Sequence, residues 1–404
     1  MIKLFLNSCL VRINKLFQIF FYFFCFTIPL NQSVSIKVLV ATLILSFFVR
    51  PDSSHNSHNY LKGSWDIVLY LLVLLIGLAY TEDLILGFRV IETNFSFLAI
   101  PIVIGRLSAI DGKGMKVIFT AFIVGLVVAS IICFTYAIFR FIQNNEMQVF
   151  FFDNFTEPIY SHPTYFAYYL IFAISVKLYF LFYGSEEIRP ILSFALILFL
   201  FFALILTGGQ TAFISLLFVF SFFILKFFTE EKSNEKIRFI MFIALMLCCM
   251  FLIIIVEKDN RVLIILNDSW ERAVLWESAV AAVPNPLLGV GTGDYKIALN
   301  DYYTTHNLSQ FASESYNAHN QLLQLLFSNG ILGVIAFCIM LGRPLYRAFM
   351  NRNILAVLCL FPFLIYGMTE VFLGRYQGVV FFALLHQLFS SEMNSETQRL
   401  QTPK

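Results

Sequence analysis

The sequence contains few charged residues. They make up 13% of its 404 residues, against about 25% in an average soluble domain, whereas hydrophobic residues reach 59%. This composition argues strongly against a soluble globular protein and, with 49 phenylalanines present, against a disordered chain. The net charge of +2 provides no large basic surface, so nucleic acid is not an expected partner.

The cysteines lack the spacing of a disulfide framework or a zinc site. All seven lie within apolar runs, and none is spaced with histidine as zinc ligands are. We therefore expect neither a structural metal nor a cofactor. The apolar runs also lack the alternation of membrane β-strands. What remains is an all-α, polytopic membrane protein.

Twelve apolar segments are candidate membrane-spanning helices, because a span needs about 20 mainly apolar residues. We treat residues 1–404 as one integral membrane domain, since no internal repeat is visible. The predicted spans are residues 13–30, 36–49, 65–80, 90–104, 115–142, 164–183, 190–206, 211–228, 238–256, 320–342, 354–373 and 376–390.

Lysine and arginine gather on one side of this arrangement. If the N-terminus is cytoplasmic, most of the 27 basic residues fall in cytoplasmic connections or in the two tails. Acidic stretches such as Glu82-Asp83 fall on the opposite side. The positive-inside rule therefore predicts that both termini are cytoplasmic.

Residues 257–319 form a long polar connection on the outer side, between the ninth and tenth spans. A loop of this length usually has a function or a fold of its own. Asp268, followed three residues later by a glutamate, has the form of a capping box. We therefore predict a surface helix from about residue 269 to 283.

Arg272 and Trp276 lie one turn apart on one face of that helix. The guanidinium of Arg272 is able to bind a phosphate through two hydrogen bonds. The alternative is an interfacial arginine that stacks on Trp276 or pairs with Glu271 or Glu277.

The glycine-rich sequence of residues 289–293 follows the predicted helix. It looks like a phosphate loop, but no Lys-Ser/Thr follows and no strand precedes it, so we reject a nucleotide site. We interpret the glycines as a turn. Close approach of the backbone to a ligand is the alternative.

His319 stands directly before the tenth span. With Asn317 as N-cap, His319 falls in the first turn, where the helix dipole disfavours a charged imidazole. A neutral histidine suits a general base, and a hydrogen-bonded boundary histidine is the alternative. Gly330 and Gly333 share its face of the helix, which predicts a groove for another helix or a lipid tail.

His319-Asn320, followed by Gly330 and Gly333 after a long outer loop, resembles the signature of the O-antigen ligase family. The resemblance implies a bacterial inner-membrane glycosyltransferase whose active site faces the periplasm. Such an enzyme transfers a glycan from undecaprenyl diphosphate to lipid A–core. The resemblance also implies that membrane lipids surround the enzyme and that the transfer requires no metal ion. His319 would match the histidine proposed to activate the acceptor hydroxyl, and Arg272 the arginine proposed to bind the donor diphosphate.

One position departs from the family pattern. The family usually carries a second arginine in a short turn before the eighth span, where this sequence has Gln210. Glutamine donates hydrogen bonds to phosphate but has no charge. Arg375, in the outer turn before the last span, is a candidate replacement, as are Arg89 and Lys258. Interfacial anchoring is the alternative for each.

Asn320, Trp276, His162 and Glu370 complete the predicted substrate site. His162 either contacts an acceptor sugar or only begins the sixth span, because a proline follows it. Glu370 is an ionisable group in a membrane segment and is therefore a functional candidate. Its alternative role is to pair with Arg375.

The sequence does not identify the acceptor, and enzymes with other acceptors are the nearest alternatives. An O-antigen or exopolysaccharide polymerase and a protein O-glycosylating ligase would use the same kind of donor. A polysaccharide transporter would favour broken, polar helices near the bilayer midplane and repeated halves. Here the polar candidates cluster at the outer boundary, which favours interfacial transfer.

Overall fold

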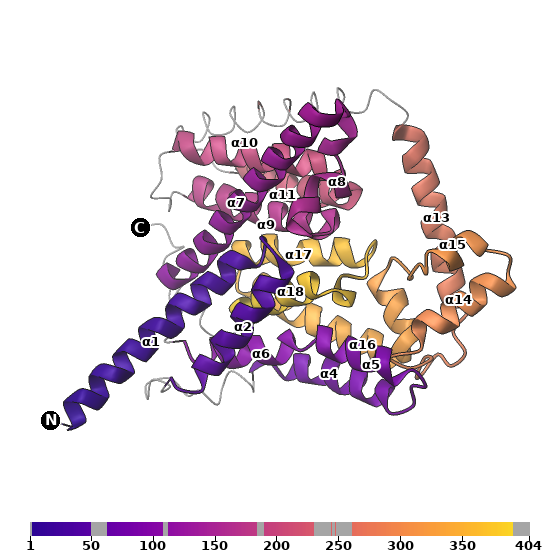
Figure 1. Ribbon diagram of the computed structural model, residues 1–404, viewed down its shortest axis with the longest axis horizontal. Coiled ribbons are helices and arrows are strands. Elements are labelled where there is room, and N and C mark those ends of the chain that lie inside the picture. The colour runs from indigo at the N-terminus through magenta and orange to yellow at the C-terminus, as the bar shows by residue number, and fades with distance from the viewer. Residues whose placement is uncertain are drawn as a thin grey trace. The chain divides into compact units, whose positions relative to one another are not determined.

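The computed structural model describes residues 2–49, 63–107, 112–183, 190–229, 244, 247 and 261–390. All regular secondary structure in these ranges is helical, which confirms the predicted fold class (Figure 1). The chain forms two compact units, Met1–Gly125 with Arg272–Lys404 and Leu126–Glu271. Each is described separately.

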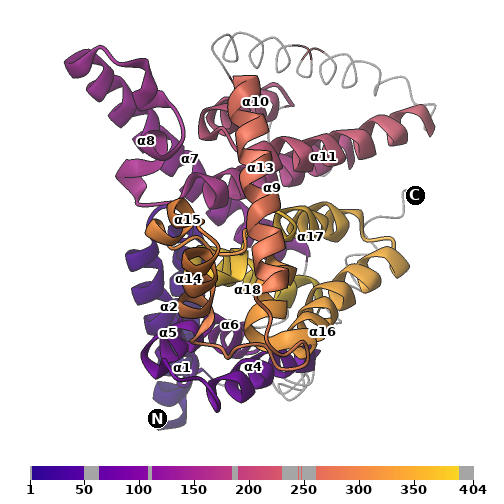
Figure 2. The same ribbon diagram turned by 90° about the vertical axis from the view of Figure 1, so that its right-hand side faces the viewer.

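The first unit contains the helices that carry the His319 region. In it α16 packs along α4 and α17, α18 packs on α6, and α14 lies beside α15 (Figure 2). Its complete elements are α1 (Ile2–Thr27), α2 (Gln32–Ser46), α4 (Trp65–Leu78), α5 (Leu84–Thr93), α6 (Ser96–Ile104), α14 (Tyr295–Thr305), α15 (Ser309–Ser313), α16 (Gln321–Met350), α17 (Ile354–Gly367), η3 (Phe372–Gly374) and α18 (Tyr376–Ser390). It also contains α7 (Gly112–Asn144) up to Gly125 and α13 (Arg261–Ala281) from Arg272 on.

The second unit is built around α9, which packs against α10 and α11. It also contains the remainder of α7 and the first turns of α13. Its other elements are η1 (Met147–Phe150), α8 (Asp153–Thr156), η2 (Glu157–Ile159), α9 (Pro163–Tyr183), α10 (Pro190–Thr207) and α11 (Gln210–Thr229).

Five helical stretches in the described ranges are long and apolar enough to cross a membrane, and shorter apolar helices accompany them. The chain is therefore a multi-pass membrane protein, while the number of twelve spans stays a prediction. The predicted span 238–256 lies almost entirely outside the described residues. The five stretches are Leu84–Ile104, Lys113–Asn144, Pro163–Tyr183, Pro190–Thr207 and Gln321–Met350.

Two predicted helix starts were wrong. The fourth span begins at Leu84 rather than at residue 90, because the side chain of Asp83 accepts a hydrogen bond from the Leu86 N–H and caps the helix there. Helix α13 begins at Arg261, so it already runs through Asp268. The apolar residues that follow Arg261 extend the helix, and the local capping signal does not start it.

Helix α16 is interrupted at Gly330, whose φ is +64°. The chain of residues 286–291 docks at this break: Ile331 N donates to the Pro286 carbonyl at 2.8 Å, and Val290 N donates to the Phe327 carbonyl at 2.9 Å. A Cβ on Gly330 would collide with the Leu287 carbonyl, so glycine is required for this approach. The predicted groove for a lipid tail or another helix is therefore wrong at Gly330, because the protein's own loop fills the site.

The backbone N–H groups of the glycine-rich segment 289–293 all donate hydrogen bonds within the protein. Its five backbone N–H groups, in chain order, donate to Asn285 O, Phe327 O, Ser328 O, Gly77 O and Thr81 Oγ1. The hydroxyl of Thr292 also donates to the Leu74 carbonyl at 2.8 Å. No N–H of this described segment is left for a phosphate or another ligand. The segment is a turn, as predicted, and it joins α4 to the broken helix α16.

Candidate functional site

His319 lies just before helix α16 rather than inside its first turn. Asn320 is the N-cap: its backbone is extended, and its Oδ1 accepts from Leu322 N at 2.9 Å and Leu323 N at 3.1 Å. The Asn317 side chain instead accepts from His319 N at 2.9 Å. The prediction of Asn317 as N-cap was therefore wrong, and the dipole argument made for His319 loses its basis.

The imidazole of His319 faces the carboxylate of Glu370. Its Nδ1 atom lies 3.6 Å from Oε2 of Glu370, and the two side chains are 29% and 17% exposed. Glu370 follows the end of α17, where its N–H donates to the Tyr366 carbonyl at 2.8 Å. The structure thus joins two predicted site residues into an acid–histidine pair that remains accessible from outside.

Two amide side chains fasten the segments that carry this pair. Nδ2 of Asn320 donates to the Met368 carbonyl at 3.1 Å, and Oε1 of Gln321 accepts from Leu373 N at 2.9 Å. Both amides are buried. Asn320, predicted as a substrate contact, therefore has an observed structural role, because it caps α16 and holds the 368–373 segment beside His319.

Arg375 does not pair with Glu370. No salt bridge joins them in the described part of the chain, so the predicted alternative for Glu370 was wrong. Arg375 begins α18, with its carbonyl accepting from Gly378 N and Val379 N, and its side chain is exposed. Arg89 is exposed on α5, and Lys258 lies outside the described residues.

Trp276 brings α13 against the His319 turn. Its Nε1 donates to the His319 carbonyl at 3.5 Å. Arg272 lies one turn earlier on α13 and is half-buried. Among the residues whose side chains the structure describes, its guanidinium makes no salt bridge, hydrogen bond or ring contact. The predicted alternatives, stacking on Trp276 or pairing with a glutamate, are therefore not observed.

The segment between α13 and α16 has a core of its own. Leu275, Leu299, Tyr303, Phe311 and Phe327 form a buried cluster that joins α13, α14, α15 and α16. Burial raises the pKa of Tyr303, so its phenol stays uncharged. This cluster gives the long outer connection a fixed shape around His319, in agreement with the expectation that it has structure of its own.

His162 and Gln210 belong to the second unit and are not among the residues that the first unit brings together. The His162 carbonyl accepts from Tyr165 N at 3.1 Å and Phe166 N at 3.3 Å, so His162 directly precedes α9, and its role in binding sugar stays a prediction. Gln210 is the first residue of α11 and is half-exposed.

A buried ionic cluster of Asp66, Arg343 and His386 lies toward the C-terminal end of α16 and was not predicted from the sequence. Oδ1 of Asp66 lies 2.9 Å from Nη1 of Arg343, and Oδ2 of Asp66 lies 2.9 Å from Nε2 of His386. Asp66 and His386 are fully buried. The available signal was the presence of ionisable residues inside apolar spans. Arg343 lies 13 residues beyond the break at Gly330, about 20 Å along the second part of α16, so the cluster is separate from the His319 site.

Comparison with known proteins finds one family similarity, which covers part of the chain. Residues 194–338 match the family model described as O-antigen ligase. The matched stretch contains Gln210, Arg272, Trp276 and His319. No curated protein matches the chain at a significant level. Residues 194–338, in a chain rich in apolar helices, are thus similar to the O-antigen ligase family.

Proposed function

We propose that the protein transfers a glycan from undecaprenyl diphosphate to lipid A–core, at the periplasmic face of the bacterial inner membrane. The observation that carries the proposal is the contact of 3.6 Å between His319 and Glu370. The contact through Trp276 places this pair against α13, the helix that also carries Arg272. A base and a cation are the two groups that such a transfer requires.

His319 is the proposed base. The acceptor hydroxyl attacks the anomeric carbon of the donor sugar, the bond from that carbon to the diphosphate oxygen breaks, and the hydroxyl proton passes to His319. Because Nδ1 faces Glu370, Nε2 is the ring nitrogen that remains for the acceptor. Glu370 holds the ring in this orientation and offsets the charge that develops on it.

Arg272 is the proposed diphosphate ligand. The leaving group carries negative charge, and a guanidinium binds phosphate oxygens through two parallel hydrogen bonds. Arg272 has no salt-bridge partner among the residues whose side chains the structure describes. In this scheme no metal ion neutralises the diphosphate, and Arg375 is a further cation available at the outer side.

The direction of α16 supports a periplasmic site. His319 and Asn320 precede its first residue, whereas Arg347 lies in its last turn. Arginines at a membrane boundary favour the cytoplasmic side. The end that carries His319 is then periplasmic, where lipid-linked glycans meet lipid A–core.

Deletion of the gene, followed by analysis of lipopolysaccharide and carrier lipid, tests the proposal. We expect core lipid without long chains and accumulation of the glycan on undecaprenyl diphosphate. Core lipid that bears one repeat unit would instead indicate a polymerase. Intact lipopolysaccharide with altered glycoproteins would indicate a protein-directed enzyme.

Complementation of the deletion tests the role of His319. His319→Ala should lower transfer by about 10²- to 10⁴-fold, the usual contribution of a general base, while the protein still inserts. His306→Ala is the matched control, because His306 is an exposed histidine whose Nδ1 lies 2.9 Å from the Tyr302 carbonyl of its own helix. Wild-type polysaccharide in the His319→Ala strain would remove His319 from the reaction.

A further inference from the structure

Two aromatic side chains flank His319. The ring of Tyr316 lies 5.6 Å from the imidazole, centroid to centroid, with an angle of 44° between the planes. The indole Nε1 of Trp276 donates a hydrogen bond to the backbone carbonyl of His319. The three side chains are half-exposed and come from two different segments, α13 and the loop before α16.

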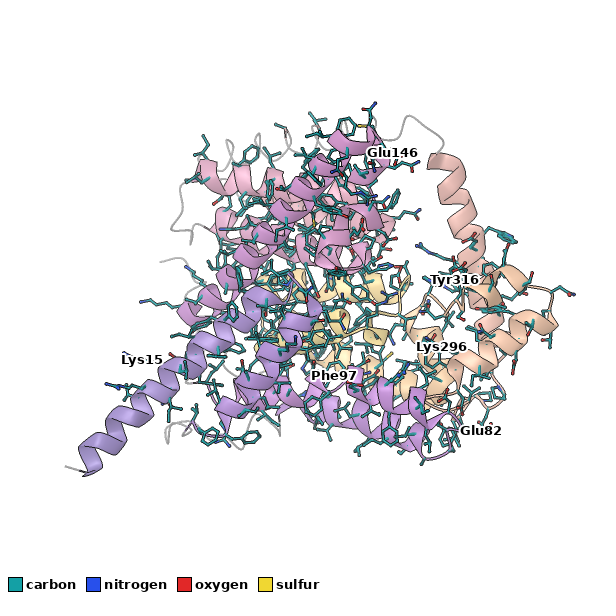
Figure 3. The ribbon with its side chains drawn as sticks, in the orientation of Figure 1. Lys15, Glu82, Phe97, Glu146, Lys296 and Tyr316 are labelled. Atoms are coloured by element: carbon teal, nitrogen blue, oxygen red, sulfur yellow. The ribbon has the colours of Figure 1, made fainter. Side chains whose placement is uncertain are left out.

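Tyr316, labelled in Figure 3, packs against the buried cluster of the outer segment. Its ring packs edge-on against buried Phe311 at 5.7 Å, and Phe311 in turn contacts Tyr303 at 5.8 Å. A row of rings therefore runs from the buried core of α14 and α15 to the imidazole. Tyr316 N also donates to the Phe311 carbonyl at 3.2 Å. These contacts fix the ring before any ligand arrives.

The backbone around Tyr316 adopts an uncommon conformation. Ser315 and His319, at the two ends of this short loop, have φ values of +50° and +40°. Non-glycine residues rarely occupy this region, and its cost is of the order of 1 kcal/mol or more for each residue. The packing of Tyr316 and the hydrogen bond that His319 N donates to the Asn317 side chain hold the loop in this form.

We propose that Tyr316 and Trp276 form a subsite that holds a pyranose ring of the glycan beside His319. The inference rests on the proposed function and deepens it. One face of a pyranose ring is made of C–H groups, which match a flat aromatic surface. Either the acceptor or the donor glycan supplies this ring.

The test uses the full-length protein in lipid nanodiscs and three probes: lipid A–core, the host's undecaprenyl-diphosphate-linked glycan, and undecaprenyl diphosphate without a glycan. Tyr316→Leu should weaken binding of one glycan-bearing probe by about three- to tenfold, the effect of one aromatic contact. Binding of undecaprenyl diphosphate should not change. The probe that loses affinity identifies the source of the sugar.

Two variants separate the aromatic face from other roles of Tyr316. Tyr316→Phe keeps the ring and should bind the glycan-bearing probes within about twofold of wild type. Tyr302→Leu is the matched control, because Tyr302 is a half-exposed tyrosine of the same outer segment that stacks on His306 instead. It should bind all three probes as wild type does.

Equal binding of both glycan-bearing probes by wild type and Tyr316→Leu would overturn the subsite and leave the proposed function intact. Equal weakening of all three probes would also overturn it, because Tyr316 would then serve only as packing or as an interfacial anchor. If the wild-type protein binds none of the probes, the proposed function fails, and the subsite fails with it.

Discussion

The imidazole of His319 and the carboxylate of Glu370 approach to 3.6 Å although α16 and α17 separate them in the chain. The approach depends on Asn320, whose side-chain amide caps α16 and also binds the Met368 carbonyl. One asparagine thus sets both the start of the helix and the distance to the acid. This geometry leads to a specific expectation for each member of the pair.

Replacement of Glu370 by glutamine should reduce glycan transfer by about tenfold, which corresponds to about 1.4 kcal/mol in the barrier. The amide keeps the shape of the side chain but no longer offsets the charge that develops on His319. Transfer should be measured in membranes with donor in excess, so that the loss appears in kcat. Glu370→Asp should recover part of the activity. A Glu370→Gln protein as active as wild type would limit Glu370 to packing.

Arg272→Ala should raise the KM for the lipid-linked donor and cause that donor to accumulate in membranes. Arg272→Lys should restore the charge but not the two parallel hydrogen bonds, so its activity should fall between those of wild type and Arg272→Ala. Glu277→Gln is the control, because Glu277 is exposed on the same helix. Normal donor turnover in Arg272→Ala would contradict a role for the guanidinium in donor binding.

The elements that the sequence predicts well depend on composition and local periodicity. Long apolar runs account for the all-helical class, and the spacing of Arg272 and Trp276 places them on one face of one helix. The proximity of that helix to His319 followed from the family resemblance, and the contact between Trp276 and His319 agrees with it.

The features that were not predicted from the sequence depend on contacts between distant segments. Asn317 and Asn320 are equally good N-caps locally, and the bond from Asn320 to the Met368 carbonyl distinguishes them. The break at Gly330 exists because the chain near Leu287 reaches it. Asp66 pairs with residues on two other helices, which a linear pattern does not reveal.

The docked glycine loop makes a prediction about stability. Gly330→Ala should lower the unfolding free energy by at least about 2 kcal/mol, because alanine at positive φ costs about 1–2 kcal/mol and its Cβ also collides with the Leu287 carbonyl. Gly342→Ala on the same helix is the control, since a Cβ there meets no atom within 4 Å among the described residues. Thermal unfolding of both variants in detergent provides the measurement. Equal melting temperatures would show that the loop does not stabilise the break.

The ionic cluster at the other end of α16 should be important for stability but not for transfer. Asp66→Asn leaves Arg343 and His386 without their buried counter-charge, and breaking such a pair costs about 3–5 kcal/mol. The double variant Asp66→Leu/Arg343→Leu should recover part of this loss, because it removes the unpaired charge together with its partner. Asp301→Asn, at an exposed aspartate, should melt as wild type does.

Activity distinguishes this stabilising role from a catalytic one. Because Arg343 lies about 20 Å along α16 beyond the break at Gly330, the transfer rate per folded molecule should be unchanged in the double variant. The folded fraction can be measured by size-exclusion chromatography in detergent and used to normalise the rate. A normal melting temperature combined with a lost transfer rate would show that Asp66 and Arg343 take part in function. A stable Asp66→Asn protein would instead show that Arg343 and His386 find other partners.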